Sequence, residues 1–390
     1  MIVAFIFFSV SYIFHPARPE LGFLFSFADA PYNWENWHDQ SVYFSVANKL
    51  VDGSFSANSY SQTGLGYPIL SIPSIILNSK DSILYHHSFF IPNLLMFLAT
   101  VYVTFSLMKK STKNFWLPIL GISAFLFVSP YLLWFVEPWN GHVVDFGIIG
   151  IVYFLMRDHG EVTKKSIIFA SLLAGWIFAA RYVDIIWVLP IFVAFFIFKP
   201  KKFLYFFPCI IIIGLVLFSH WVYFDDPLML LSNFDRFTEN ENGRRLYEKT
   251  GIGIFNLEIT TLGNRTFCLF FNPSNCIPPE TGDDYVDNWW FKALDNKIPL
   301  SVYGLGLLVF SPLGIFILLR KYEIRQKSIL VGLLIGFLGS FVFYTSIYAF
   351  PSGWTPFFRY HIFWIPVFAV FSIYGLNFVY QKMRLASKEN

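Results

Sequence analysis

A series of long apolar runs constrains this chain more than any other feature. After a shorter first run at 1–14, the runs lie at 87–108, 115–136, 140–156, 166–181, 183–198, 203–224, 299–319, 328–350 and 360–380. A helix of about 20 apolar residues crosses the ~30 Å hydrocarbon core of a bilayer. Only 14% of the 390 residues are charged, against about 25% in soluble domains, which leaves too little polar surface for a water-soluble fold. The sequence therefore predicts an all-α polytopic membrane protein with about ten transmembrane helices.

Basic residues are distributed unevenly between the two ends of the predicted helices. With the N-terminus in the cytoplasm, the loops on that side carry 16 basic residues and four acidic ones. Loops rich in Lys and Arg stay in the cytoplasm, so this bias predicts that both termini lie inside. Residues 1–14 are then a first spanning helix and not a secretory signal peptide, because no basic residue precedes them. The apolar segment 67–78 is too short to span, and we expect it to lie along the membrane or to dip into it.

This arrangement predicts one transmembrane domain over 1–390 with two larger segments on the outer side. Residues 15–86 form the first outer loop, with helices lying at the membrane surface and the start of the second span at its end. Residues 225–298 form a large outer loop, which is too long for a simple connection. It contains Cys268 and Cys276, for which a disulfide is one option in an oxidising compartment. Their spacing alone leaves open whether they pair.

The first outer loop contains the strongest candidate for a catalytic residue. Asp39, Tyr43, Ala47 and Leu50 recur every three or four residues, which predicts a helix with one docking face. Gly53 follows the last periodic residue and suits the left-handed turn that ends a helix. Asp39 then lies in the first helical turn, where exposed backbone N–H groups favour a negative charge. A carboxylate held ionised beside a membrane can act as a base.

Other ionisable residues on the outer side are further candidates, because charges in or beside a membrane are costly to keep. Glu137 and His142 lie in the turn between two spans, and Asp145 lies one helical turn into the second of them. Arg181 ends a short span, and Arg359 begins the last one. Carboxylates and arginines on one membrane face suit chemistry on a phosphorylated lipid. Arg binds phosphate oxygens, and a carboxylate takes a proton from an attacking hydroxyl. The alternative is that each residue is an interfacial charge that pairs with a neighbour or reaches the headgroups.

The order of these motifs resembles the membrane glycosyltransferases of the GT-C superfamily. The pattern Asp-x-x-x-Tyr-x-x-x-Ala-x-x-Leu that begins at Asp39 is followed by Gly66-Tyr67-Pro68. Ser129-Pro130 before Glu137, Ala180-Arg181-Tyr182, Asp225-Asp226-Pro227 and Arg359-Tyr360 are similar to later landmarks of these enzymes. The chain is most similar to the branch of protein mannosyltransferases and aminoarabinose transferases. It departs from that branch at His38 and Gln40, since many members have an acidic pair in the first loop.

This resemblance implies an enzyme of the plasma (inner) membrane of a prokaryote, with its active site facing outward. The enzyme would move a sugar from a polyprenyl-phosphate donor to a hydroxyl of a lipid, glycan or protein, with inversion at the anomeric carbon. The resemblance implies no nucleic-acid partner and no certain cofactor, and it leaves the need for a divalent metal open. A lipid-linked sugar transporter or flippase and a polysaccharide polymerase or ligase are the alternative functions. The candidate site residues are Asp39 and Glu137 for catalysis and Arg359, Arg181, Tyr43, His142 and Tyr67 for substrate binding.

Overall fold

The structure is a computed structural model that describes residues 1–13, 38–55, 64–80, 82–112, 114–127, 135–136, 138–156, 162–227, 298–321, 324–347 and 364–389. Among these residues the regular elements are all helices, and no strand occurs. The α-helices are α1 (Ile2–Ile13), α3 (His38–Val51), α4 (Ile72–Leu77), α5 (Ile83–His86), α6 (Phe90–Ser111), α7 (Trp116–Phe127), α9 (Gly141–Met156), α10 (Lys164–Ala180), α11 (Ile185–Phe198), α12 (Phe207–Phe224), α17 (Ile298–Lys321), α18 (Ile324–Ile347) and α20 (Ile365–Glu389). Three 3₁₀ helices accompany them: η4 (Pro68–Ser71), η5 (Tyr182–Asp184) and η6 (Pro200–Phe206).

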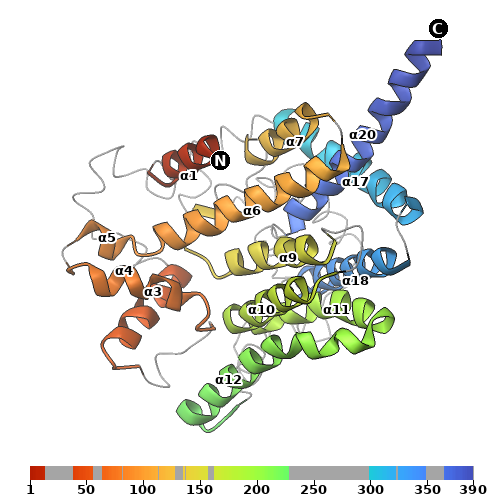
Figure 1. Ribbon diagram of the computed structural model, residues 1–390. Coiled ribbons are helices and arrows are strands. Elements are labelled where there is room, and N and C mark those ends of the chain that lie inside the picture. Colours follow the sequence, from red (N-terminus) through yellow and green to blue (C-terminus); the bar gives the residue numbers. More distant parts are fainter. Residues whose placement is uncertain are drawn as a thin grey trace, which may run out of the picture.

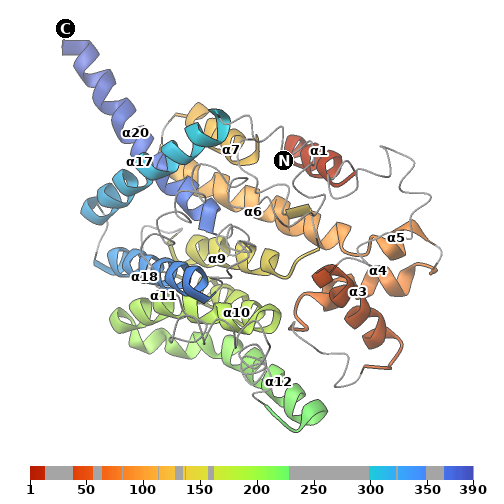
Figure 2. The same cartoon turned by 180° about the vertical axis from the view of Figure 1, so that it is seen from behind.

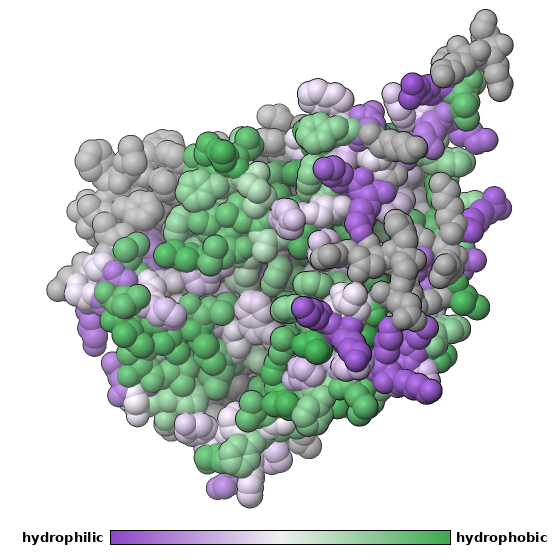
Figure 3. All heavy atoms as spheres, in the orientation of Figure 1, coloured by the Kyte–Doolittle hydropathy of each residue, from purple (hydrophilic) through white to green (hydrophobic). Residues whose placement is uncertain are grey.

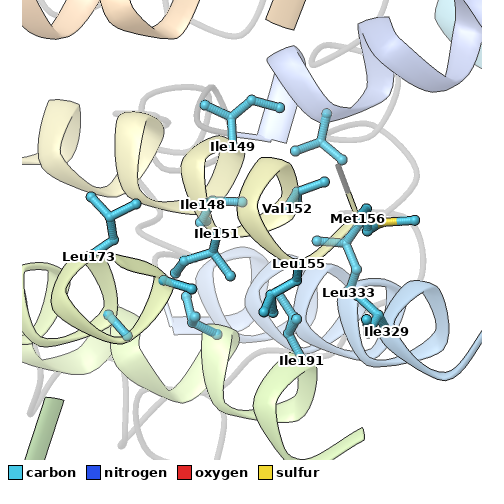
Figure 4. Close-up of a cluster of buried hydrophobic side chains, with 14 of the residues drawn as sticks. Ile148, Ile149, Ile151, Val152, Leu155, Met156, Leu173, Ile191, Ile329 and Leu333 are labelled. Atoms are coloured by element: carbon cyan, nitrogen blue, oxygen red, sulfur yellow. The ribbon is translucent and has the colours of Figure 1, made fainter. Parts of the chain in front are cut away.

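The long helices pack side by side as a bundle in which consecutive members run in opposite directions (Figures 1 and 2). The most extensive contacts join α17 to α20, α11 to α18, and α10 to both α9 and α12. Figure 4 shows the centre of the bundle, where Leu155 of α9 faces Ile191 of α11 and Leu333 of α18. All three side chains are buried in one continuous apolar cluster. This core holds α9, α10 and α11 in fixed positions relative to one another.

Each predicted apolar run overlaps a helix within the described residues. Within the described residues, three helical stretches are long and apolar enough to cross a membrane, at Phe90–Lys110, Pro200–Tyr223 and Gln326–Phe343. The all-helical prediction is therefore confirmed for the described residues, and the total of ten spans stays a prediction. Residues 68–77 form the two short helices η4 and α4, in line with a segment too short to span. The last helix differs from its expected end at 380, because α20 continues to Glu389 and extends beyond the bundle (Figure 1).

The two ends of the bundle differ in chemistry. Basic residues gather where α6, α11 and α17 end and where α10 begins, namely Lys109, Lys110, Lys164, Lys165, Lys199 and Arg320. Lys202 of η6 lies at this end too, and its ammonium donates to the carbonyl of Val162 at 2.8 Å. Figure 3 shows most of the visible hydrophilic side chains on this side of the molecule. The opposite end contains α3, α4, α5, the start of α9 and the junction of α10 and α11 (Figure 1).

Glycines allow α17 and α20 to approach closely. A Cβ on Gly314 would lie 1.9 Å from the carbonyl oxygen of Phe371, and one on Gly375 would lie 2.2 Å from that of Phe310. The Ser311 hydroxyl, one turn before Gly314, donates to the carbonyl of Phe368 at 2.9 Å. Small residues at such crossings let helix backbones pack tightly within a membrane.

Gly314→Ala is therefore expected to lower the free energy of unfolding by about 1–3 kcal/mol, because the added methyl group forces α17 and α20 apart. Gly306→Ala is the matched control, since a Cβ at Gly306 in the same helix would meet no atom within 4 Å. Removing this glycine should leave stability unchanged or raise it by roughly 0.4–1 kcal/mol. Unfolding of both variants in detergent gives the comparison, and equal effects would show that the close crossing is not what limits stability.

Candidate functional site

The helix α3 docks at the end of the bundle opposite the basic residues. Tyr43 and Ala47 are buried, as their periodicity predicted, and Phe44 is buried beside them. Leu50 is only half-buried, so the docking face is centred nearer to the start of the helix than the sequence suggested. Asp39 lies in the first turn of α3, as predicted, and its side chain is outside the described part of the structure.

The end of α3 has the geometry that Gly53 predicted. Gly53 has a φ of +67°, a left-handed conformation that suits a residue without a side chain. The N–H of Ser54 donates to the carbonyl of Lys49 at 3.0 Å, which is the 6→1 hydrogen bond of a Schellman turn. The end of α3 is therefore set locally, by the left-handed conformation of Gly53 and the hydrogen bond that follows it.

The turn before η4 lies directly on the end of α10. The N–H of Gly66 donates to the carbonyl of Ala179 at 2.9 Å, and the indole N–H of Trp176 donates to the carbonyl of Gly66 at 2.8 Å. A Cβ on Gly66 would lie 2.7 Å from the carbonyl carbon of Ala179, and one on Gly64 only 2.0 Å from its oxygen. Glycine is required at both positions because the two backbones touch. This contact fixes the position of the following residue, Tyr67.

Tyr67 connects three parts of the site from a fully buried position. Its hydroxyl donates to Oδ1 of Asn93 in α6 at 2.8 Å and accepts from the backbone N–H of Trp139 at 3.0 Å. Its ring stacks on Phe89 at 4.8 Å and meets the ring of Tyr43 edge-on at 5.1 Å. Burial raises the pKa of Tyr67 well above its usual range, so the phenol keeps the proton that it donates.

Residues 138–142, which end in the first turn of α9, are held against the end of α10. The Asn140 amide donates to the carbonyl of Ala180 at 3.3 Å. The guanidinium carbon of Arg181 lies 5.4 Å from the centre of the Trp139 ring, within the range of a cation–π contact. His142 is fully buried, with its ring stacked on Phe135 at 4.2 Å and edge-on to Trp139 at 5.6 Å. Aromatic rings thus enclose the polar side chains of this segment.

A buried cluster of charged residues lies beside these rings. Nε of Arg181 is 2.9 Å from Oδ2 of Asp184, whose Oδ1 accepts from the indole N–H of Trp187 at 3.1 Å. Nδ1 of His142 is 3.7 Å from Oδ2 of Asp145. Both aspartates are at most 1% exposed, and within the described structure neither oxygen of Asp145 has a hydrogen-bond partner. A buried carboxylate without hydrogen bonds is costly, so Asp145 marks this cluster as a candidate functional site.

The structure brings together four of the predicted site residues: Tyr43, Tyr67, His142 and Arg181. Glu137 and Arg359, like Cys268 and Cys276, lie outside the described residues. The sequence indicated Asp145 as an ionisable residue of the outer side but gave it no role, and Asp184 was not among the candidates. The i,i+3 spacing of these aspartates from His142 and Arg181 is the signal that would have placed them in the site. Over the part of the chain that the structure describes, no group of three or more His, Cys, Asp or Glu side chains could hold a metal ion.

Comparison with known proteins adds no assignment, because no protein-family model, no curated protein and no solved structure matches this chain. The GT-C resemblance therefore rests on the order of the sequence motifs. The physical basis for a function is the buried cluster at one end of an apolar helical bundle.

Proposed function

We propose that this protein is a membrane glycosyltransferase that uses a polyprenyl-phosphate-linked sugar as donor. The observation that carries the proposal is the cluster of Arg181, Asp184, His142 and Asp145 at the end of the bundle that α3 covers, in which the histidine and both aspartates are buried. A substrate with a long apolar chain and a charged, polar head requires an apolar bundle and a polar site at its end. The GT-C-like order of motifs supports the same assignment. In this proposal about ten helices span the membrane, and the site faces outward.

The proposed reaction is a direct displacement at the anomeric carbon of the donor sugar. Asp39 takes the proton from the acceptor hydroxyl as its oxygen forms a bond to the anomeric carbon. The bond from that carbon to the phosphate oxygen breaks, and the lipid phosphate leaves with the electron pair. A phosphate is a stable leaving group, so one base suffices and the anomeric configuration inverts. Glu137 is assigned to the acceptor, where it orients the hydroxyl.

Arginine side chains are assigned to the donor phosphate. Arg181 lies at the cluster, but Asp184 engages its Nε. Arg359 is therefore assigned the larger share of phosphate binding. Its planar guanidinium matches two phosphate oxygens at once, which a lysine ammonium does not.

The direct test incubates the purified protein with a panel of polyprenyl-phosphate-linked sugars and measures release of polyprenyl phosphate. Wild-type protein is expected to release it only when a hydroxyl acceptor is present. Arg359→Ala should raise the donor KM by about 10–100-fold, the effect of losing one charge-assisted hydrogen bond of roughly 1.5–3 kcal/mol. Arg320→Ala is the control, because Arg320 ends α17 at the basic end of the bundle.

Two results would contradict the proposal. One is folded protein that releases no polyprenyl phosphate from any donor of the panel. The other is movement of intact donor across the bilayer of proteoliposomes without cleavage, which would identify a flippase.

A further inference from the structure

We propose that Tyr67 is a positioning residue that couples α3, which contains Asp39, to residues 138–142, which follow Glu137 in the chain. This inference rests on the proposed glycosyltransferase function. Tyr67 is fully buried, with its hydroxyl bonded inside the protein both as donor and as acceptor. It acts on the reaction through its neighbours and not by touching substrate.

One side of Tyr67 contacts the helix that contains Asp39. The Tyr67 ring meets the ring of Tyr43 edge-on, with 5.1 Å between their centres. Tyr43 follows Asp39 by four residues in α3, so the two share one face of the helix. Tyr43 is itself only 2% exposed, and this ring contact is part of the surface on which α3 docks. A shift of Tyr67 would therefore move the first turns of α3.

The other side of Tyr67 holds the segment that follows Glu137. The hydroxyl of Tyr67 accepts from the N–H of Trp139, which is two residues after Glu137. Tyr67 and Trp139 are also both fixed to the end of α10. Gly66 bonds to Ala179, and the Trp139 ring lies beneath the guanidinium of Arg181. α3 and residues 138–142 thus both contact Tyr67, through its ring and its hydroxyl, and the turn that contains Tyr67 is held at the end of α10.

The chain offers a matched control for removing this hydroxyl. Tyr85 of α5 also donates its hydroxyl to an asparagine Oδ1, that of Asn48 near the end of α3. Tyr85 is also buried, and its ring packs edge-on against Phe44 at 5.5 Å. Asn48 keeps a second hydrogen bond to the carbonyl of Phe44, at 3.0 Å. Tyr67→Phe and Tyr85→Phe therefore each remove a hydroxyl that donates to an asparagine, from rings that contact the neighbouring residues Tyr43 and Phe44 of α3.

Tyr67→Phe is expected to lower kcat by about 100-fold, the effect of misplacing reacting groups by roughly 1 Å, with the donor KM nearly unchanged. Tyr85→Phe should keep kcat close to the wild-type value. In the Tyr67→Phe background, Glu137→Gln should reduce kcat by much less than in the wild type, since effects of coupled residues do not add. A wild-type kcat for Tyr67→Phe, equal losses in both tyrosine variants, or fully additive losses with Glu137→Gln would overturn the proposal.

A second measurement does not require activity. Hydrogen exchange of the backbone amides at residues 138–142 should be faster in Tyr67→Phe, because the Trp139 N–H loses its acceptor, and unchanged in Tyr85→Phe. If amide exchange at residues 138–142 is unchanged in Tyr67→Phe, the proposed coupling is ruled out, whether or not the protein has transferase activity. If exchange is faster in Tyr67→Phe but the wild-type protein has no transferase activity, the coupling stands and the proposed function is wrong. If Tyr67→Phe does not fold, Asn93→Ala removes the other partner of the hydroxyl, and an unchanged kcat in that variant would contradict the proposal.

Discussion

Replacing Asp39 with asparagine is expected to lower the rate of sugar transfer by about 10²–10⁴-fold, the usual contribution of a general base. Asparagine has nearly the same shape and still forms hydrogen bonds, but it accepts no proton at neutral pH. The expected loss is therefore in kcat, with little change in folding or donor binding. Single-turnover transfer of a labelled sugar separates the chemical step from binding.

Asp52→Asn is the matched control for this prediction. Asp52 follows the last turn of the same helix α3, and it is exposed. The substitution removes the same charge at the far end of the same helix, so transfer should stay near the wild-type rate. Wild-type transfer by Asp39→Asn would show that another residue is the base, and Glu137→Gln would then be tested in its place. Equal losses in both aspartate variants would indicate an effect of charge on α3 and not of proton transfer.

The second large effect is expected from the two buried aspartates of the cluster, whose substitutions should change stability in different ways. Asp184→Asn is expected to lower the free energy of unfolding by about 3–5 kcal/mol, because it removes one partner of a buried ion pair with Arg181. Asp145→Asn should leave stability unchanged or raise it. The carboxylate of Asp145 is buried without a hydrogen bond in the described structure, so a neutral amide removes an unfavourable charge.

Chemical unfolding of both variants in detergent, together with their transfer rates, checks this contrast. A variant Asp145→Asn that is at least as stable as the wild type and less active would show that the buried carboxylate serves function at the expense of stability. A loss of stability in Asp145→Asn as large as that in Asp184→Asn would show instead that both aspartates are structural.

Much of the candidate site could be named from the sequence, but not the contacts of its members. Tyr67 was expected to bind substrate as part of the Gly66-Tyr67-Pro68 motif of the GT-C resemblance, and Arg181 as a charge that ends a span. The structure places Tyr67 in the interior between Asn93 and Trp139, and it pairs Arg181 with Asp184. Which neighbour a side chain meets depends on the rotation of each helix about its axis. A single sequence contains only weak information on that rotation.

From the sequence alone it could be predicted which stretches form helices and, at Gly53, where one of them ends. Apolar runs, and a glycine such as Gly53 after the last periodic residue of α3, act through hydrogen bonds between near neighbours in the chain, so they can be read locally. Which helix ends meet depends instead on how the bundle packs. Tyr67 and Trp139 are 72 residues apart, and Gly66 and Trp176 are 110 apart. Their hydrogen bonds exist because the packed bundle brings the turn before η4 onto the end of α10, a contact that side chains at Gly64 and Gly66 would prevent.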